Sequence, residues 1–165
     1  ISPYGVTKLA AESLCYAYWR NFGIPVVVLR YFTVYGPRQR PDMAFYRFIR
    51  AILEDEEVEV YGDGTQTRDF TYVGDVVEAT VRATELPDGE IFNVGSGSRI
   101  SIKRAIEILE GLMGRKARVR YSDAMKGDIG DTYADISKIR RFLDYNPKGL
   151  EEGLAEEIEW LRGSG

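Results

Sequence analysis

The chain has 165 residues, of which 44% are hydrophobic and 29% are charged, and its formal net charge is -4. This composition fits a globular protein, and the acidic balance without a basic run argues against a nucleic-acid-binding surface. The absence of histidine excludes histidine-based triads, and every zinc site that needs a histidine ligand, within these residues. With no long apolar run, no visible export signal and a single cysteine, Cys15, we expect a cytoplasmic protein without an internal disulfide.

The first predicted element is a helix from about Tyr4 to Asn21, capped by Ser2 and ended by Gly23 and Pro25. The run at 26–29 is short, apolar and β-branched without alternation. That pattern predicts a strand buried on both faces of a parallel sheet.

The remaining elements alternate along the chain. Helices are predicted at about 43–54, 75–84, 101–113, 136–143 and 150–161, and strands near 58–61, 69–73, 91–94 and 118–121. This alternation indicates an α/β fold. Because the sequence enters on a helix, and one or two parallel strands are not stable alone, we expect the chain to be part of a larger fold.

Tyr4 and Lys8 are four residues apart in the first predicted helix, so they share one helix face. A neighbouring ammonium stabilises a phenolate, and the pair can therefore act as a general base without histidine. The alternative is a solvated lysine beside a packed tyrosine on an amphipathic helix. The spacing by itself does not separate these two interpretations.

The wider sequence resembles the extended short-chain dehydrogenase/reductase family, and within it the NAD-dependent nucleotide-sugar epimerases and dehydratases of the UDP-glucose 4-epimerase type. The resemblance covers essentially the whole chain. Its segments occur in the family order: 4–8 (YGVTK), 29–37 (LRYFTVYGP), 60–64 (VYGDG), 68–73 (RDFTYV), 92–95 (FNVG), 127–128 (GD) and 134–135 (AD).

The resemblance implies an NAD-dependent epimerase in which Tyr4 is the catalytic base and acid. It implies transient oxidation at the sugar C4, rotation of the keto intermediate and return of hydride to its other face. Lys8 would bind the nicotinamide ribose and support Tyr4, while Tyr31 and Phe32 match positions that line the nicotinamide.

Three further positions match residues that bind the nucleotide sugar in the family. Thr33 stands where many relatives have an asparagine that contacts the diphosphate, and Arg68 matches an arginine that grips the same group. A surface ion pair with Asp69 is the alternative for Arg68. Tyr61 matches a side chain near the nucleobase, and a packed strand aromatic is its alternative.

The segment after residue 122 carries the last two candidates. Asp128 matches an acid that binds the nucleotide ribose, with an ordinary turn aspartate as the alternative. Thr132 matches a position that limits the sugar pocket, and its small side chain would leave room for an N-acetylated hexose. The family often places a second phosphate-binding arginine at the position of Met125, and the adjacent Lys126 is a candidate substitute.

The expected fold is the C-terminal part of a doubly wound NAD-binding Rossmann domain plus a small α/β substrate-binding lobe. Residues 1–57 would belong to the Rossmann domain and 58–165 mainly to the lobe, with 91–95 returning to the Rossmann sheet. The Gly-rich pyrophosphate turn and the acidic ribose-binding residue that such a domain needs are not in the sequence. The isolated chain is therefore expected to bind NAD poorly and to be inactive.

Two other functions remain open at this point. A related dehydratase, decarboxylase or reductase would differ mainly upstream of Tyr4, and a non-catalytic nucleotide-sugar or NAD-binding module has little need of the Tyr4–Lys8 pair. No metal site is expected. The resemblance also implies a homodimer formed through the helix that carries Tyr4 and Lys8.

Overall fold

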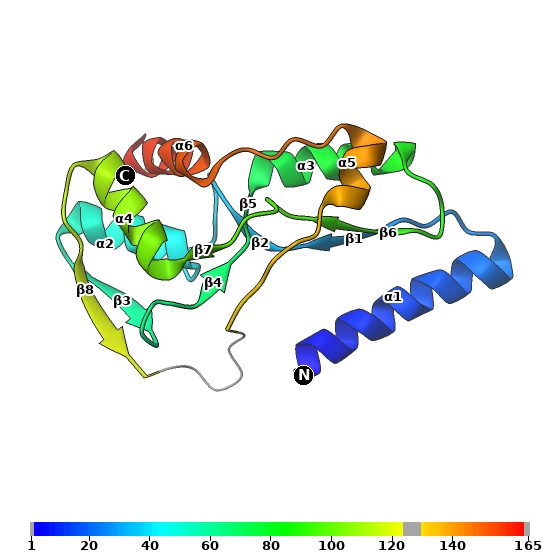
Figure 1. The fold of residues 1–165 in the computed structure, drawn as a ribbon, viewed down its shortest axis with the longest axis horizontal. Helices are drawn as coiled ribbons and strands as arrows, with labels where there is room; N and C mark the ends of the chain where they lie inside the picture. Colours follow the sequence, from blue (N-terminus) through cyan, green and yellow to red (C-terminus); the bar gives the residue numbers. More distant parts are fainter. Residues whose placement is uncertain (1, 124–129, 164–165) are drawn as a thin grey trace.

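The structure is a computed structural model that describes residues 2–123 and 130–163. It is an α/β fold whose strands form four two-stranded pairs, three parallel and one antiparallel (Figure 1). This confirms the expected fold class. None of the helices in the described ranges combines the length and apolar character that crossing a bilayer requires.

The first helix, α1 (Pro3–Phe22), has the predicted bounds to within one residue. The Ser2 hydroxyl accepts a hydrogen bond from the Gly5 amide at 3.0 Å, and Gly23 ends the helix in the left-handed conformation (φ 65°). None of its residues is buried. Figure 1 shows α1 on the opposite side of the central strands from α3 and α5.

The strand predicted at 26–29 is β1 (Val28–Tyr31), two residues further along the chain. It pairs in parallel with β6 (Ile91–Val94), and β2 (Thr33–Tyr35) pairs in parallel with β5 (Phe70–Tyr72). The prediction that this strand is buried on both faces is wrong for this chain. Its residues are half-buried or exposed, because α3 and α5 cover one face whereas α1 stands away from the other.

A first hydrophobic core lies among three helices and the inner strands. The helices are α2 (Ala44–Glu54), α4 (Ile102–Met113) and α6 (Leu150–Gly163), and the largest buried side chains include Phe45, Ile49, Leu109 and Leu154. Each of these helices was predicted, since each places its apolar residues on one face.

A second core packs α3 (Val73–Val81), the 3-10 turn η1 (Arg82–Glu85) and α5 (Ser137–Leu143) against β6. Phe92, Ile139 and Leu143 are fully buried there, and Leu29 and Phe32 pack against this core from the β1 side. The central strands contribute to both cores, since Tyr35 of β2 and Phe70 of β5 belong to the first and Phe92 of β6 belongs to the second.

The outer strands extend the fold beside the first core. β3 (Glu57–Tyr61) pairs in parallel with β8 (Arg118–Ser122), and β4 (Thr67–Arg68) pairs antiparallel with β7 (Ile100–Ser101). β2, β4 and β7 were not predicted. Each has only two or three residues, which is too short to show a periodic pattern.

Candidate active site

The first turns of α1 carry the Tyr4–Lys8 pair. The Lys8 ammonium lies 5.4 Å from the centre of the Tyr4 ring, which is the proximity that their four-residue spacing predicts. Tyr4 is 71% exposed, so its phenol is accessible to a ligand. The helix cap at Ser2 fixes the backbone on which both side chains stand.

A pocket of about 430 Å³ lies between α1 and β1 and brings together three of the predicted site residues. Tyr4 and Lys8 line it from the helix, and Tyr31 lines it from the end of β1. The remaining lining residues are Ala11, Glu12, Cys15, Val28, Leu29 and Arg30. A phenol, an ammonium and apolar walls suit the nicotinamide and ribose end of a dinucleotide, so the residues present fit that part of the expected cofactor.

An ion pair connects the two walls of this pocket. Arg30 on β1 donates two hydrogen bonds to the Glu12 carboxylate on α1, at 2.7 and 2.6 Å. These bonds lower the pKa of Glu12, and they raise the pKa of Arg30. On the other side of β1, the Tyr31 hydroxyl lies 2.9 Å from the Thr80 hydroxyl of α3. Tyr31 is therefore tied to α3, while its neighbour Arg30 is tied to α1.

Phe32 and Thr33, which follow Tyr31, face different surroundings. Phe32 packs against the second core and is not among the residues that line the pocket. Thr33 begins β2, where its amide donates to the Asp69 carbonyl oxygen at 3.1 Å. The parallel pairing of β2 with β5 thus brings Thr33 to the segment that contains Arg68.

A second group of predicted residues gathers around Asp69. The Arg68 guanidinium donates to the carbonyl oxygens of Thr67 and Gly130, at 2.9 and 3.1 Å. The Thr132 hydroxyl accepts a hydrogen bond from the Asp69 amide at 3.0 Å. Thr33 and Thr132 therefore meet at the main chain of Asp69, next to Arg68, although they are far apart in the sequence.

From the sequence, Asp69 is expected only as an alternative ion partner for Arg68. In the structure Asp69 is fully buried, and its carboxylate accepts hydrogen bonds from the 96–97 turn and from Ala134. The one sequence signal for its burial was the position of this charged residue directly before the short apolar strand β5. Its partners could not be identified because they come from distant parts of the chain.

Tyr61 is the last residue of β3. Its hydroxyl donates to the Glu59 carboxylate at 3.2 Å, and the Arg47 guanidinium lies 5.9 Å from its ring centre. Arg47 also bonds Glu59 at 3.1 Å, so a network that was not predicted from the sequence orients this aromatic ring. Asp128, Met125 and Lys126 lie outside the described residues.

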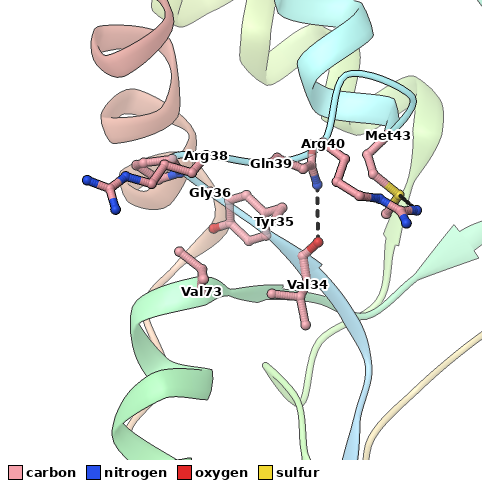
Figure 2. A pocket seen from close by; sticks show the side chains of 9 residues that line it. Val34, Tyr35, Gly36, Arg38, Gln39, Arg40, Met43 and Val73 are labelled. Carbon is pink, nitrogen blue, oxygen red and sulfur yellow. Dashed lines mark hydrogen bonds between the residues drawn. The ribbon is translucent and has the colours of Figure 1, made fainter.

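A smaller pocket of about 300 Å³ follows β2 and is shown in Figure 2. Gln39 closes one side by donating to the Val34 carbonyl oxygen at 3.1 Å, and the Arg38 and Arg40 guanidinium groups point to opposite sides of the loop (Figure 2). This loop connects β2 to α2, so it follows the strand that carries Thr33. Over the described part of the chain, no group of three or more acidic or cysteine side chains is arranged to hold a metal ion.

Comparison with known proteins identifies a family. The NAD dependent epimerase/dehydratase family matches residues 1–95. An uncharacterized UDP-glucose epimerase of Bacillus subtilis, YtcB, is 47% identical over 164 residues, which are 98% of this chain and 52% of that protein. A UDP-glucuronate 4-epimerase of Thermodesulfobacterium geofontis is 46% identical, covering 98% of this chain and 51% of its own length.

The solved structures agree with the sequence matches. UDP-glucuronic acid 4-epimerase from Bacillus cereus, in complex with UDP-glucuronic acid and NAD, superposes with a TM-score of 0.93 at 48% identity. The alignment covers 99% of this chain and 54% of that one. A more distant relative, from Bacillus cytotoxicus, is a UDP-N-acetyl-alpha-D-glucosaminuronate decarboxylase with 36% identity, covering 96% of this chain and 53% of that protein. The chain spans about half the length of the curated relatives it matches.

Proposed function

The chain belongs to the NAD dependent epimerase/dehydratase family, and from that membership we propose that it contributes the proton-transfer residues and much of the substrate site of a UDP-sugar 4-epimerase. The observation that carries this proposal is the meeting of Tyr4, Lys8 and Tyr31 around one pocket. The names of the most similar relatives support UDP-glucose and UDP-glucuronate as the first substrates to consider.

In the proposed reaction, the Tyr4 phenol holds and moves one proton. As the phenolate it accepts the proton of the sugar C4 hydroxyl, and as the phenol it returns that proton after the sugar has turned over. Lys8, whose ammonium lies 5.4 Å from the centre of the Tyr4 ring, would support the phenolate and would donate to the nicotinamide ribose. When bound, NAD would supply the acceptor, and in its reduced form the donor, of the C4 hydride.

The substrate would be held by the residues that gather around Asp69 and by those of the outer strands. Arg68 is suited to the diphosphate because a guanidinium binds phosphate oxygens with two parallel hydrogen bonds. Thr33 would add a hydroxyl to that group, Tyr61 would stack near the nucleobase and Asp128 would accept from the ribose hydroxyls. Phe32 would line the nicotinamide beside Tyr31.

The division into two parts at residue 57 is also proposed, with 91–95 belonging to the cofactor domain. The parallel pairing of β6 with β1 supports this last point. A homodimer through α1 is proposed because that helix leaves Val6, Leu9, Leu14 and other apolar side chains 59–71% exposed. We also retain the proposal of a cytoplasmic protein.

The function is tested with the full-length protein that contains this chain, incubated with NAD and, separately, with UDP-glucose, UDP-glucuronate and UDP-N-acetylglucosamine. Formation of the 4-epimer from at least one sugar supports the proposal. Loss of carbon dioxide or water without epimerisation would favour the decarboxylase or dehydratase alternative. In a parallel titration, the isolated 165-residue chain is expected to bind NAD weakly and to convert none of the sugars.

A further inference from the structure

The side chain of Asp69 is fully buried at the junction between β4 and β5. Its Oδ1 accepts hydrogen bonds from the Ser96 amide (2.6 Å), the Ser96 hydroxyl (2.8 Å) and the Thr71 hydroxyl (3.3 Å). Its Oδ2 accepts from the amides of Gly97 and Ala134, both at 3.0 Å. Three of the five donors are backbone amides, which can only donate, so both oxygens must act as acceptors.

Four of the five donors come from two segments distant in the sequence, and the backbone there is shaped around the carboxylate. At Gly95, a Cβ atom would overlap the Ala134 methyl group and lie 3.2 Å from each Asp69 oxygen. Gly97 has a φ of 69°, a conformation that residues other than glycine rarely adopt. The 95–97 turn and the segment at Ala134 are therefore fastened to each other through Asp69.

The main chain of Asp69 contacts the proposed substrate residues directly. Its amide donates to the Thr132 hydroxyl at 3.0 Å, and its carbonyl oxygen accepts from the Thr33 amide at 3.1 Å. Arg68 is its immediate neighbour in the chain. The buried carboxylate consequently fixes the one backbone position on which Thr33, Arg68 and Thr132 converge.

We propose that Asp69 is the positioning residue of the nucleotide-sugar site, holding Thr33, Arg68 and Thr132 in register through its five side-chain hydrogen bonds. This inference rests on the proposed function, because it takes those three residues as the ones that meet the substrate. Asp69 itself does not touch the substrate. It acts by fixing the backbone from which Arg68 reaches the diphosphate.

Replacing Asp69 by asparagine gives a sharp test, since the two side chains have the same shape. Whichever oxygen becomes an NH₂ group then faces at least one backbone N–H, and that contact turns from attractive to repulsive. In full-length Asp69→Asn, the dissociation constant for UDP is expected to rise about tenfold or more. The dissociation constant for NAD should stay unchanged, because the Tyr4–Lys8 pocket is formed by α1 and β1.

Two further variants separate positioning from general stability. Asp88→Asn changes an exposed aspartate and should alter neither dissociation constant. In an Arg68→Ala background, Asp69→Asn should weaken UDP binding by less than it does alone, since part of its effect passes through Arg68. If Asp69→Asn does not fold, Ser96→Ala tests the positioning role of Asp69 instead. It removes one donor to the carboxylate and should still weaken UDP binding about threefold.

The inference is overturned if a folded Asp69→Asn protein, or failing that Ser96→Ala, loses thermal stability while binding UDP as tightly as the unmodified protein. Equal weakening of UDP and NAD binding would also overturn it. Failure of the proposed function looks different, because the unmodified protein would then form no 4-epimer from any of the three sugars.

Discussion

Glu12 and Arg30 join the helix that carries Tyr4 to the strand that carries Tyr31. The two side chains form a two-point ion pair at 2.7 and 2.6 Å, and the Glu12 side chain is only 15% exposed. Because α1 buries none of its own residues, this pair is a principal tie between the helix and the sheet. The position of the Tyr4 phenol relative to Tyr31 therefore depends on it.

Glu12→Gln is expected to raise the dissociation constant for NAD in the full-length protein and to destabilise it by about 1 kcal/mol. The pKa of Glu12 is lowered in the folded state, so its stabilising contribution is present above the ordinary glutamate range and is lost as the pH falls through the folded-state value. Glu85→Gln, which breaks the more exposed pair with Arg82, is the control and should leave NAD binding unchanged.

Two variants of Thr132 test whether the size of its side chain or its hydrogen bond with the Asp69 amide determines which sugars the pocket accepts. Thr132→Tyr should selectively abolish turnover of the N-acetylated sugar by filling the pocket. Thr132→Val keeps the size but removes the hydroxyl that accepts from the Asp69 amide, and should weaken both sugars equally by about tenfold. Steady-state KM values for UDP-glucose and UDP-N-acetylglucosamine measure this; equal loss of the two sugars in Thr132→Tyr would contradict a size limit.

Gly95 should not tolerate any side chain. A Cβ atom there would overlap the Ala134 methyl group, so Gly95→Ala is expected to destabilise the fold by about 2–3 kcal/mol. The matched control is Gly111→Ala on α4, where nothing lies within 4 Å of the added atom and a gain of about 0.5–1 kcal/mol is expected. Thermal unfolding of the two variants should shift in opposite directions, and a shared direction would contradict the packing described.

The buried side chain of Glu157 on α6 should make the free energy of unfolding depend on pH in an unusual way. The residue is fully buried, and within 2–123 and 130–163 no hydrogen bond of ordinary geometry reaches its carboxyl oxygens, with the Gly36 amide as the one nearby group that favours the carboxylate. Burial raises its pKa to about 8. As the pH rises from the ordinary glutamate range towards 8, the unfolded chain releases this proton while the folded chain keeps it. Stability is therefore lost over that interval.

Glu157→Gln should remove this loss. Relative to the unmodified protein, the variant should gain stability between about pH 5 and pH 8, by an amount on the order of 3–5 kcal/mol. Glu159→Gln, an exposed position on the same helix, should show no such gain. Chemical denaturation at several pH values measures the free energy of unfolding of each variant. If Glu157→Gln differed from the unmodified protein by the same amount at every pH, the buried carboxyl would be excluded as the cause.

The sequence predicted the parts of this molecule that local signals determine. Ser2 and Gly23 define the ends of α1, and the four-residue spacing of Tyr4 and Lys8 predicted their proximity. The family resemblance predicted the fold class, and the match of residues 1–95 confirms the family.

The unpredicted features depend on contacts between distant residues. The Asp69 carboxylate accepts hydrogen bonds from Ser96, Gly97 and Ala134, and no local sequence pattern predicts that these residues meet. The exposure of β1 was missed for a similar reason. Its apolar sequence indicates what the strand could bury, whereas its actual burial depends on which elements cover it.

Whether Tyr4 transfers the proton in the epimerisation is decided by Tyr4→Phe in the full-length protein. The change removes one hydroxyl, so kcat with UDP-glucuronate or UDP-glucose should fall at least about 100-fold. The dissociation constants for NAD and UDP should remain unchanged. Tyr16→Phe, at another exposed tyrosine of the same helix, should retain full activity. A Tyr4→Phe enzyme that epimerises its substrate at the unmodified rate would contradict the account.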